Sequence, residues 1–363
     1  MIRVTANLAW LVPGGVGGSE EYTIRLLRAV IQSAPADIEL RIVGSADLRA
    51  TYPELGEVPY SVIPGPLGSR PYRVVAESTL GYARTAGADV VHHFGGRVPT
   101  RRHGNDIVTI HDLQPLDMPE NFSFVKRHYL QWALPRSVRA ARAICVPSHW
   151  VAASVVQHFG IDPDRVRAVS STWDQAAPAP SSLPEVAGPV VLYPAMTHPH
   201  KNHLVLLEAV DRLGASHPEL TLVLTGAAGR ADADVAARIG RSRVRVLRTG
   251  RVPAETLGAW MARADVLAFP SRYEGFGLPV LEAMRMGTPV VAADATALPE
   301  VVGDAGILVD PDDIEGWVAA LGDVLGNAGT RARLRGAADA HLAGYAPQAA
   351  ASRLVEMWRA AAV

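Results

Sequence analysis

The sequence predicts an α/β protein built from two doubly wound domains, each with a parallel sheet covered by helices. Its 363 residues exceed the roughly 250–300 residues at which one hydrophobic core stops growing. In both halves, strand-length segments that are apolar on both faces alternate with helical patterns, which is typical of a covered parallel sheet. A segment rich in Pro, Ala and Ser separates the halves and has neither a helical nor a strand period.

The expected strands set the domain boundaries. In the first half they are 2–12, 38–44, 89–94, 106–112 and 142–147, and in the second 189–195, 220–226, 243–250, 264–271, 288–294 and 306–310. We therefore expect an N-terminal domain at 1–172, a linker at 173–189 and a C-terminal domain at 190–346. The last helical segment, 347–363, is expected to pack back on the N-terminal domain. Such sheets bind ligands at the carboxyl ends of their strands, so a ligand cleft is expected between the domains.

Composition excludes some classes of protein. The chain is 48% hydrophobic and 20% charged with a formal net charge of −1, whereas a nucleic-acid binder would show a strongly basic domain or stripe. The single cysteine, Cys145, reads as a buried strand residue and cannot form an internal disulfide, which favours a reducing, cytoplasmic location. Neither a signal peptide nor a transmembrane run is expected.

A glycine-rich loop follows the first expected strand and leads into a helix. Ser19 fits the N-cap of that helix, with acidic residues in the first turn. A helix N-terminus behind such a loop favours an anion or an uncharged polar group. The glycines occur as two doublets separated by Val16, which departs from G-x-G-x-x-G, and no acidic residue ends the second strand, so a dinucleotide site is not favoured. A tight turn between strand and helix is the alternative. The loop glycines are Gly14, Gly15, Gly17 and Gly18.

Lys201 follows the first strand of the second half, in the segment HPHKNH. Asn202 fits a helix N-cap, and Leu204, Leu207 and Val210 are expected on the buried face. A lysine beside the positive end of a helix could neutralise a phosphate. The alternatives are a zinc site, whose ligand spacing is not matched, and a solvated turn. The neighbouring histidines are His198, His200 and His203.

Two glutamates flank a second glycine loop. Glu274 is expected in the loop after a buried strand, and Glu282 one turn inside a helix that starts near Pro279 and stops at Gly287. A carboxylate can recognise a sugar by accepting two hydrogen bonds from a pair of vicinal hydroxyls. The helix N-terminus would face a diphosphate. The acid–base pair of a glycosidase and two surface carboxylates are the alternatives.

These motifs resemble those of the retaining glycosyltransferases of family 4, also called glycosyl transferases group 1. The segments RYEGFGLPVLEAMRMGTPVVA, HPHKNH, TGRVPAETLGAWMARADVLAFPS and LPEVVGDAGILVDPDD carry the resemblance over nearly all of residues 190–325. PGGVGGSEEY, DVVHHFGGRVP and TIHDLQPLDMPENF extend it more loosely to the first half. The resemblance implies the GT-B fold, in which two Rossmann-like doubly wound parallel-sheet domains face each other across a cleft.

The resemblance also implies roles for residues of the second half. Glu282 would hold the donor ribose, Glu274 the hydroxyls of the donor sugar, and Lys201 the diphosphate leaving group, while Arg251 and Val252 would lie beside the base. Backbone amides near the second glycine loop would contact sugar and phosphate, at Gly275, Phe276, Gly277 and Leu278.

In the first half, the resemblance places His111 near the transferred sugar, so that Glu274, Lys201 and His111 form the expected catalytic set. The loop of Gly15, Val16, Gly17 and Gly18 would close over the diphosphate. One position departs from the family pattern, because Met196 stands where many members have an arginine five residues before the lysine. Charge at the diphosphate would then come from His198, His200, Arg251 or Arg272.

The implied reaction moves a hexose or deoxyhexose, with a mannosyl-type sugar favoured, from a nucleoside-diphosphate sugar to a glycan, glycolipid or small-molecule acceptor. Configuration would be retained, and neither a metal nor a cofactor is implied. A non-catalytic protein that binds sugar nucleotides and a GT-B epimerase are the alternatives.

A basic stretch at 124–143, which contains no acidic residue, bears on the acceptor. Aromatic and apolar residues interleave with its basic ones, and such an amphipathic face could rest peripherally on the inner, anionic face of the cytoplasmic membrane and reach a lipid-linked acceptor. A solvated helix face is the alternative, and Pro135 is expected to interrupt the helical pattern. The basic residues are Lys126, Arg127, Arg136, Arg139 and Arg142.

Overall fold

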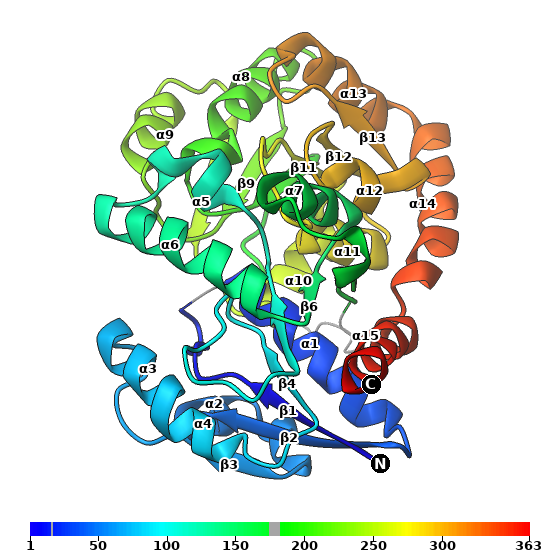
Figure 1. Ribbon diagram of the computed structural model, residues 1–363. Helices are drawn as coiled ribbons and strands as arrows, with labels where there is room; N and C mark the ends of the chain where they lie inside the picture. The colour runs from blue at the N-terminus through cyan, green and yellow to red at the C-terminus, as the bar shows by residue number, and fades with distance from the viewer. Residues whose placement is uncertain (16, 174–181) are drawn as a thin grey trace. The chain divides into compact units, whose positions relative to one another are not determined.

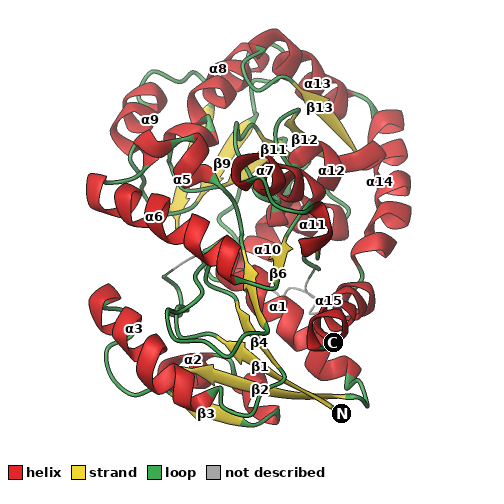
Figure 2. Cartoon of the chain, viewed as in Figure 1, coloured by secondary structure: helices red, strands yellow, loops and turns green. Residues whose placement is uncertain are grey.

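The computed structural model describes residues 1–15, 17–173 and 182–363 (Figure 1). The chain divides into two compact units. Unit 1 comprises Met1–Thr172 and Tyr345–Val363, and unit 2 comprises Trp173–Gly344. Each unit contains one parallel sheet with helices around it, which Figure 2 shows as yellow strands among red helices.

The described part of unit 1 has a seven-stranded sheet in the order β3-β2-β1-β4-β5-β6-β7, and all neighbouring strands are parallel. Its strands are β1 (Ile2–Asn7), β2 (Ile38–Gly44), β3 (Tyr60–Val62), β4 (Val90–His93), β5 (Asp106–Thr109), β6 (Ala143–Val146) and β7 (Val166–Ala168). The chain winds outward from β1 to β3 and then returns to the other side of β1. The strand order therefore reverses between β1 and β4, where sheets of this kind bind ligands.

Helices cover this sheet on both faces. They are α1 (Gly18–Ser33), α2 (Ala46–Thr51), α3 (Arg70–Ala76), α4 (Tyr82–Arg84), α5 (Gln114–Asp117), α6 (Phe124–Ala140), α7 (His149–Phe159) and α15 (Pro347–Ala362). The C-terminal helix α15 packs beside α1 (Figure 1), and Leu354 and Trp358 are fully buried in the same hydrophobic cluster as β1 and β2. The Trp358 indole N–H donates to Nδ1 of His92 at 3.0 Å, which ties the chain terminus to β4.

Two local predictions in unit 1 are wrong. Helix α1 begins at Gly18, and its N-cap is Gly17 with φ +66°, so Ser19 lies inside the helix. Glycine adopts this φ without a steric penalty, which lets the helix start earlier. Pro135 does not interrupt α6. A proline removes one backbone hydrogen bond, and here the adjoining turn is fastened by Ser137, whose hydroxyl donates to Ala133 O and accepts from the backbone N–H of Val98.

The described part of unit 2 has a six-stranded sheet in the order β10-β9-β8-β11-β12-β13, again parallel throughout. Its strands are β8 (Val190–Pro194), β9 (Thr221–Thr225), β10 (Arg245–Gly250), β11 (Val266–Phe269), β12 (Val290–Ala293) and β13 (Gly306–Val309). The order reverses between β8 and β11. This position is the switch point of the second sheet.

The helices of unit 2 are α8 (His203–Leu213), α9 (Asp232–Ile239), α10 (Ala254–Arg263), α11 (Leu278–Arg285), α12 (Leu298–Val302), α13 (Ile314–Gly326) and α14 (Ala328–Leu342). The buried face of α8 differs from the prediction, because Leu204 is exposed while Leu206, Leu207 and Val210 are buried. The helix begins at His203, which is itself buried and takes the inward position that Leu204 was expected to fill. Single-turn helices complete the fold at η1 (Pro53–Glu57), η2 (Glu77–Gly81), η3 (Pro119–Asn121), η4 (Pro163–Arg165), η5 (Pro199–Lys201), η6 (Gly303–Ala305) and η7 (Ala343–Tyr345).

No helix within the described ranges combines the length and the apolar character that a membrane span requires.

Candidate functional site

The two loops at the switch point of unit 2 meet through an ion pair. Lys201 ends the turn η5 after β8, and Glu274 lies in the loop after β11. The Lys201 Nζ lies 2.6 Å from Glu274 Oε1, and the two side chains are 19% and 13% exposed. Residues 73 positions apart in the chain thus place one positive and one negative group in a half-buried setting, where their charges are less screened than at the surface.

Hydrogen bonds from Tyr193 and from the backbone hold the two loops together. The hydroxyl of the buried Tyr193, on β8, donates to the carbonyl of Lys201 at 2.6 Å and lies 3.0 Å from Ser271 Oγ. The backbone N–H of Arg272 donates to the carbonyl of His200 at 2.8 Å. Tyr193 is not among the predicted site residues. Its signal in the sequence is a hydroxyl in an otherwise apolar strand, since a buried tyrosine hydroxyl usually has a hydrogen-bond partner.

The second glycine loop has the shape expected of a helix entry. Gly277 is the N-cap of α11 with φ +103°, and a Cβ there would lie 2.8 Å from Leu298 Cδ2, so glycine is required on two grounds. Upstream, the backbone N–H of Glu274 donates to Thr296 Oγ1 at 3.0 Å. Pro279 lies in the first turn, and Gly287 has φ +73° just beyond the helix end, which confirms both predicted positions.

The other predicted donor residues of unit 2 follow strands of the same sheet or lie in α11. Glu282 is half-buried in the second turn of α11, and Phe276 and Leu278 are buried on either side of the Gly277 cap. Arg251 and Val252 follow β10, which lies two strands from β8 in the sheet. Because the strands are parallel, their carboxyl ends share one edge, so all of these residues belong to that edge of unit 2. The structure joins Lys201 and Glu274 in direct contact.

The predicted residues of unit 1 form a separate group. His111 follows β5, and its Nε2 hydrogen-bonds the carbonyl of Phe94 at 2.8 Å, so Nε2 carries the proton. Burial lowers the pKa of His111 to about 4, although the Phe94 carbonyl favours the charged form. The imidazole is therefore neutral at physiological pH, and its ring packs edge-on against Tyr22 with the centroids 5.2 Å apart.

The first glycine loop is exposed at Gly15, Gly17 and Gly18, while Val16 lies outside the described residues. Glu20, in the first turn of α1, is buried and anchors the loop. Its carboxylate accepts from the backbone N–H of Gly14 at 2.9 and 3.0 Å and from the hydroxyl of Tyr52 at 2.8 Å. A side chain predicted only as a favourable first-turn acid thus fixes the start of the loop.

Comparison with known proteins connects both units to one family. A family model described as "Glycosyl transferases group 1" matches residues 188–327, and one described as "Glycosyltransferase Family 4" matches residues 16–174. The chain is 31% identical over 264 residues to the O-antigen chain mannosyltransferase B of Escherichia coli, covering 69% of each chain. The chain belongs to the group 1 glycosyltransferases.

Longer alignments support the same assignment of this glycosyltransferase. A D-inositol 3-phosphate glycosyltransferase of Corynebacterium efficiens is 29% identical and covers 95% of this chain and 91% of its own. The crystal structure of Anabaena HepE in complex with UDP-glucose matches with a TM-score of 0.76 at 20% identity, over 99% of this chain and 100% of the other. Together with the two parallel sheets, this likeness confirms the predicted GT-B fold of two Rossmann-like domains.

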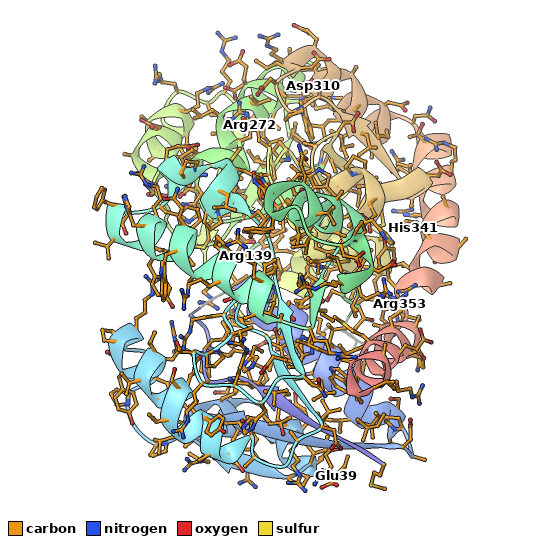
Figure 3. All side chains as sticks on the ribbon, viewed as in Figure 1. Glu39, Arg139, Arg272, Asp310, His341 and Arg353 are labelled. Carbon is orange, nitrogen blue, oxygen red and sulfur yellow. The ribbon has the colours of Figure 1, made fainter. Side chains whose placement is uncertain are left out.

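Two of the four side chains predicted to replace the arginine absent at Met196 supply no unpaired charge near Lys201. Burial is the main cause that lowers the pKa of His200 to about 3, with Lys201 and the neighbouring histidines acting in the same direction. His200 is therefore neutral and supplies no charge. Arg272 pairs with Asp312, whose Oδ1 lies 2.9 Å from Nε (Figure 3 labels Arg272). Of the four candidates, His200 therefore supplies no charge, and the charge of Arg272 is matched by that of Asp312.

The remaining features of HPHKNH are structural. Asn202 occupies the predicted N-cap of α8, but its side-chain amide donates to the carbonyl of Pro311 at 2.6 Å instead of capping the helix. His198 and His200 stack with their centroids 5.7 Å apart. Within the described residues, no group of three or more His, Cys, Asp or Glu side chains could hold a metal ion.

Proposed function

We propose that this glycosyltransferase transfers a hexose or deoxyhexose from a nucleoside-diphosphate sugar with retention of configuration, and that a mannosyl-type sugar is favoured. The observation that carries the proposal is the contact between Lys201 and Glu274 at the switch point of unit 2. A mannosyltransferase among the relatives and the UDP-glucose complex of a protein with the same fold support the donor class. The acceptor is a glycan, a glycolipid or a small molecule.

The two charged groups take different parts of the donor. Breaking the bond between sugar and diphosphate places negative charge on the leaving phosphate, and the Lys201 ammonium stabilises this charge. Glu274 accepts hydrogen bonds from the sugar hydroxyls, and Glu282 accepts them from the ribose. The backbone of Gly275, Phe276, Gly277 and Leu278 lines the path between them, and Arg251 and Val252 border the base.

The existing ion pair prepares the site for this role. Glu274 holds the Lys201 ammonium in place, and Tyr193 fixes the backbone of the same turn. A cation positioned beforehand needs little reorganisation when charge develops, which is the main advantage of a protein site over water. From unit 1, the proposal adds neutral His111 beside the transferred sugar and the loop of Gly15, Val16, Gly17 and Gly18 over the diphosphate. A leaving phosphate oxygen accepts the acceptor proton.

The test compares Lys201→Met and Glu274→Gln with Glu255→Gln, an exposed glutamate in the first turn of α10. With a panel of nucleoside-diphosphate sugars, we expect the first two variants to lose about 100-fold or more in transfer, the scale seen when one charge-stabilising group is removed. The control should retain wild-type activity. Near-normal transfer in either site variant would refute the assignment.

The same assay separates the alternative functions. A non-catalytic binder would bind the nucleotide sugar and release no glycosylated product, and an epimerase would return an altered nucleotide sugar. Proton NMR of the product distinguishes these outcomes and gives the anomeric configuration, so an inverted product would contradict retention.

The face of α6 supports peripheral association with the inner face of the cytoplasmic membrane. Phe124, Val125 and Trp132 are 70%, 75% and 56% exposed, and the Arg136 guanidinium lies over the Trp132 ring at 4.8 Å. Aromatic side chains next to arginines suit an anionic interface. Flotation with acidic liposomes tests this proposal, and unchanged flotation of an Arg136→Gln, Arg139→Gln double variant would defeat it. Figure 3 labels Arg139.

A further inference from the structure

Unit 1 has a cavity at its own switch point, which the proposed donor site does not use. The cavity has a volume of about 130 Å³. Its walls come from the segments at the ends of β1 and β4, from α3 and from α6, and the residues on them include Trp10, Gly95, Arg70 and Tyr129. Because the strand order of this sheet reverses between β1 and β4, the cavity lies where such sheets bind ligands.

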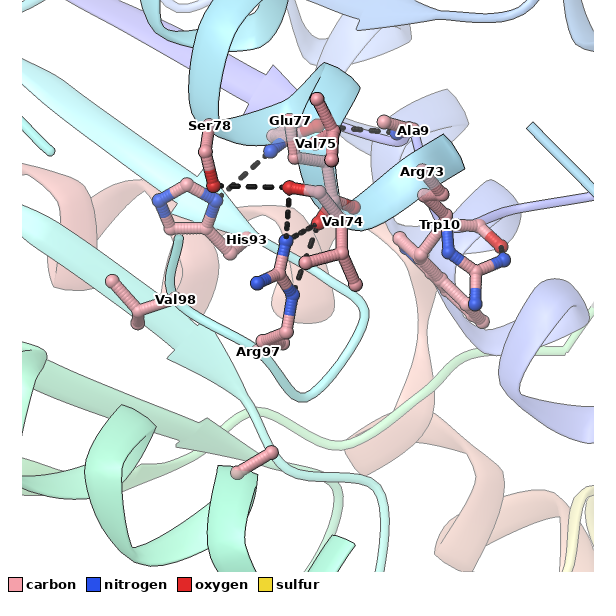
Figure 4. A network of polar contacts seen from close by, with 12 residues as sticks. Ala9, Trp10, Arg73, Val74, Val75, Glu77, Ser78, His93, Arg97 and Val98 are labelled. Carbon is pink, nitrogen blue, oxygen red and sulfur yellow. Dashed lines mark hydrogen bonds and ion pairs between the residues drawn. The ribbon is translucent and has the colours of Figure 1, made fainter. Parts of the chain in front are cut away.

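Positive charge dominates the walls of this cavity. Three arginines, Arg70, Arg73 and Arg97, line it together with one glutamate, Glu77. Arg97 pairs with Glu77 through Nε at 3.1 Å and also through Nη2, as the dashed lines in Figure 4 show. Counting three positive groups against one negative group leaves an excess of two positive charges.

Arg70 and Arg73 have no carboxylate within 4.0 Å among the residues that the structure describes. Nη1 of Arg73 contacts the carbonyls of Trp10 and Leu67, both at 3.3 Å. In the same described part of the chain, its Nε and Nη2 make no hydrogen bond. Burial is the main cause that lowers the pKa of Arg73; the charge of Glu77 opposes this shift, and the guanidinium groups of Arg70 and Arg97 add to it. Arg73 is therefore a partly buried cation with two other guanidinium groups nearby, and the one carboxylate on the cavity wall, Glu77, makes its ion pair with Arg97.

Trp10 connects this cavity to His111. Its ring lies 5.6 Å from the imidazole, centroid to centroid, and it packs so closely on Gly95 that a Cβ there would lie 2.3 Å from Trp10 Cγ. The indole N–H is buried and has no hydrogen-bond partner in the described ranges. The same side chain therefore borders both the cavity and the histidine that the proposed function places beside the transferred sugar.

We propose that the cavity binds a phosphoryl group of the acceptor, held by Arg73 and Arg70, with Arg97 and Glu77 as the fixed wall. A phosphate monoester carries a charge of about −1.5 to −2 at pH 7, which matches the excess of two positive charges, and guanidinium groups bind its oxygens in a bidentate manner. The proposal rests on the proposed function, because it names the acceptor class of that reaction. The phosphoryl group belongs either to a soluble sugar phosphate or to a lipid carrier.

The first arm of the test measures binding of inorganic phosphate to the full chain by calorimetry at neutral pH and low ionic strength. We expect Arg73→Gln and Arg70→Gln each to weaken binding roughly 10-fold or more, the size of one lost charge-assisted hydrogen bond. The matched control is Arg49→Gln, an exposed arginine of α2 in the same unit. Arg70 is also exposed, so its variant keeps the test valid if Arg73→Gln does not fold.

The second arm uses phosphatidylcholine vesicles with and without phosphatidic acid. Phosphatidic-acid binding that depends on Arg73 and Arg70 identifies a lipid source, and arginine-dependent binding in the first arm alone identifies a soluble one. Equal affinity of wild type, both variants and the control in both arms would overturn the proposal.

The proposed donor site at Lys201 and the proposed phosphoryl site in the cavity can be refuted independently of each other. Loss of transfer in Lys201→Met with phosphate binding intact leaves the donor assignment standing and supports the cavity. Arginine-independent phosphate binding in a protein whose transfer still requires Lys201 refutes the cavity alone. UDP and GDP binding should be unchanged in Arg70→Gln.

Discussion

Acid should destabilise unit 2 through a histidine that the fold keeps neutral. His203 is 2% exposed at the start of α8, and its ring packs 4.7 Å from that of Tyr193. Neither ring nitrogen has a hydrogen-bond partner within the described segments. Burial is the main cause that lowers the pKa of His203 to about 4 from its ordinary value of 6.5, and the nearby carbonyl of Ala195 acts in the opposite direction.

The sign and size of the effect follow from proton linkage. Between pH 6.5 and pH 4, the unfolded chain binds a proton at this residue and the folded chain does not, so the free energy of unfolding falls as the pH falls. For pKa values of about 4 folded and 6.5 unfolded, lowering the pH from about 7.5 to 5.5 removes about 1.3 kcal/mol. At about pH 5.5 the imidazole of the folded form is still mostly neutral. His200 acts in the same direction.

The assay is urea unfolding at both pH values for the wild type, His203→Leu and the control His217→Leu. His217 lies in the turn after α8. The His203 variant should lose about 1.3 kcal/mol less stability on acidification than the wild type, and the control should behave like the wild type. Because the other titrating groups are the same in all three proteins, the difference in stability loss between the wild type and His203→Leu reports on His203. An identical acid sensitivity in the wild type and His203→Leu would refute the reasoning.

Three further predictions concern buried positions. Gly277→Ala should lower the free energy of unfolding by about 1–3 kcal/mol in chemical denaturation, because its φ is +103° and its Cβ would crowd Leu298. Trp358→Phe removes the hydrogen bond to His92 and should cost about 1–3 kcal/mol by the same measurement, since a buried acceptor loses its partner. Burial raises the pKa of the Cys145 thiol to about 11, so iodoacetamide at pH 8 should alkylate it in urea but not in the native protein. Wild-type stability in either variant, or rapid native alkylation, would contradict the corresponding prediction.

Most of the fold could be predicted from the sequence because long apolar strands produce a clear hydrophobic pattern. Every expected strand segment contains an observed strand, from β1 at Ile2–Asn7 to β13 at Gly306–Val309. The two that were missed, β3 and β7, have three residues each, which is too short for a strand pattern to stand out. Ser19 was wrongly predicted as a helix N-cap and Pro135 as a helix interruption. At single positions, backbone geometry and tertiary packing can override the local preference of a residue type.

The candidate site, too, could be predicted only where a local sequence pattern marks its residues. Lys201 and Glu274 could be singled out because each lies in a short motif next to a strand end. Their contact depends on β8 and β11 being neighbours, which follows from the reversal of strand order and not from either motif. The arginine cavity was missed for a related reason. Arg73 and Arg97 belong to a chain with 35 lysines and arginines, and nothing in the sequence distinguishes them until α3 and the loop after β4 come together.

The two switch points differ in the balance of their positive and negative side chains. This difference affects how each would bind a phosphate. In unit 2, one cation, Lys201, is matched by one carboxylate, Glu274, so a diphosphate that takes the ammonium leaves the carboxylate in need of donors. Under the proposed roles, the hydroxyls of the donor sugar supply them, and a nucleoside diphosphate without its sugar would not. In unit 1, the Arg97–Glu77 pair can stay intact while Arg70 and Arg73 take the anion. Binding to the cavity should therefore fall with ionic strength as for a simple charge attraction, whereas binding at Lys201 depends also on the sugar that engages Glu274.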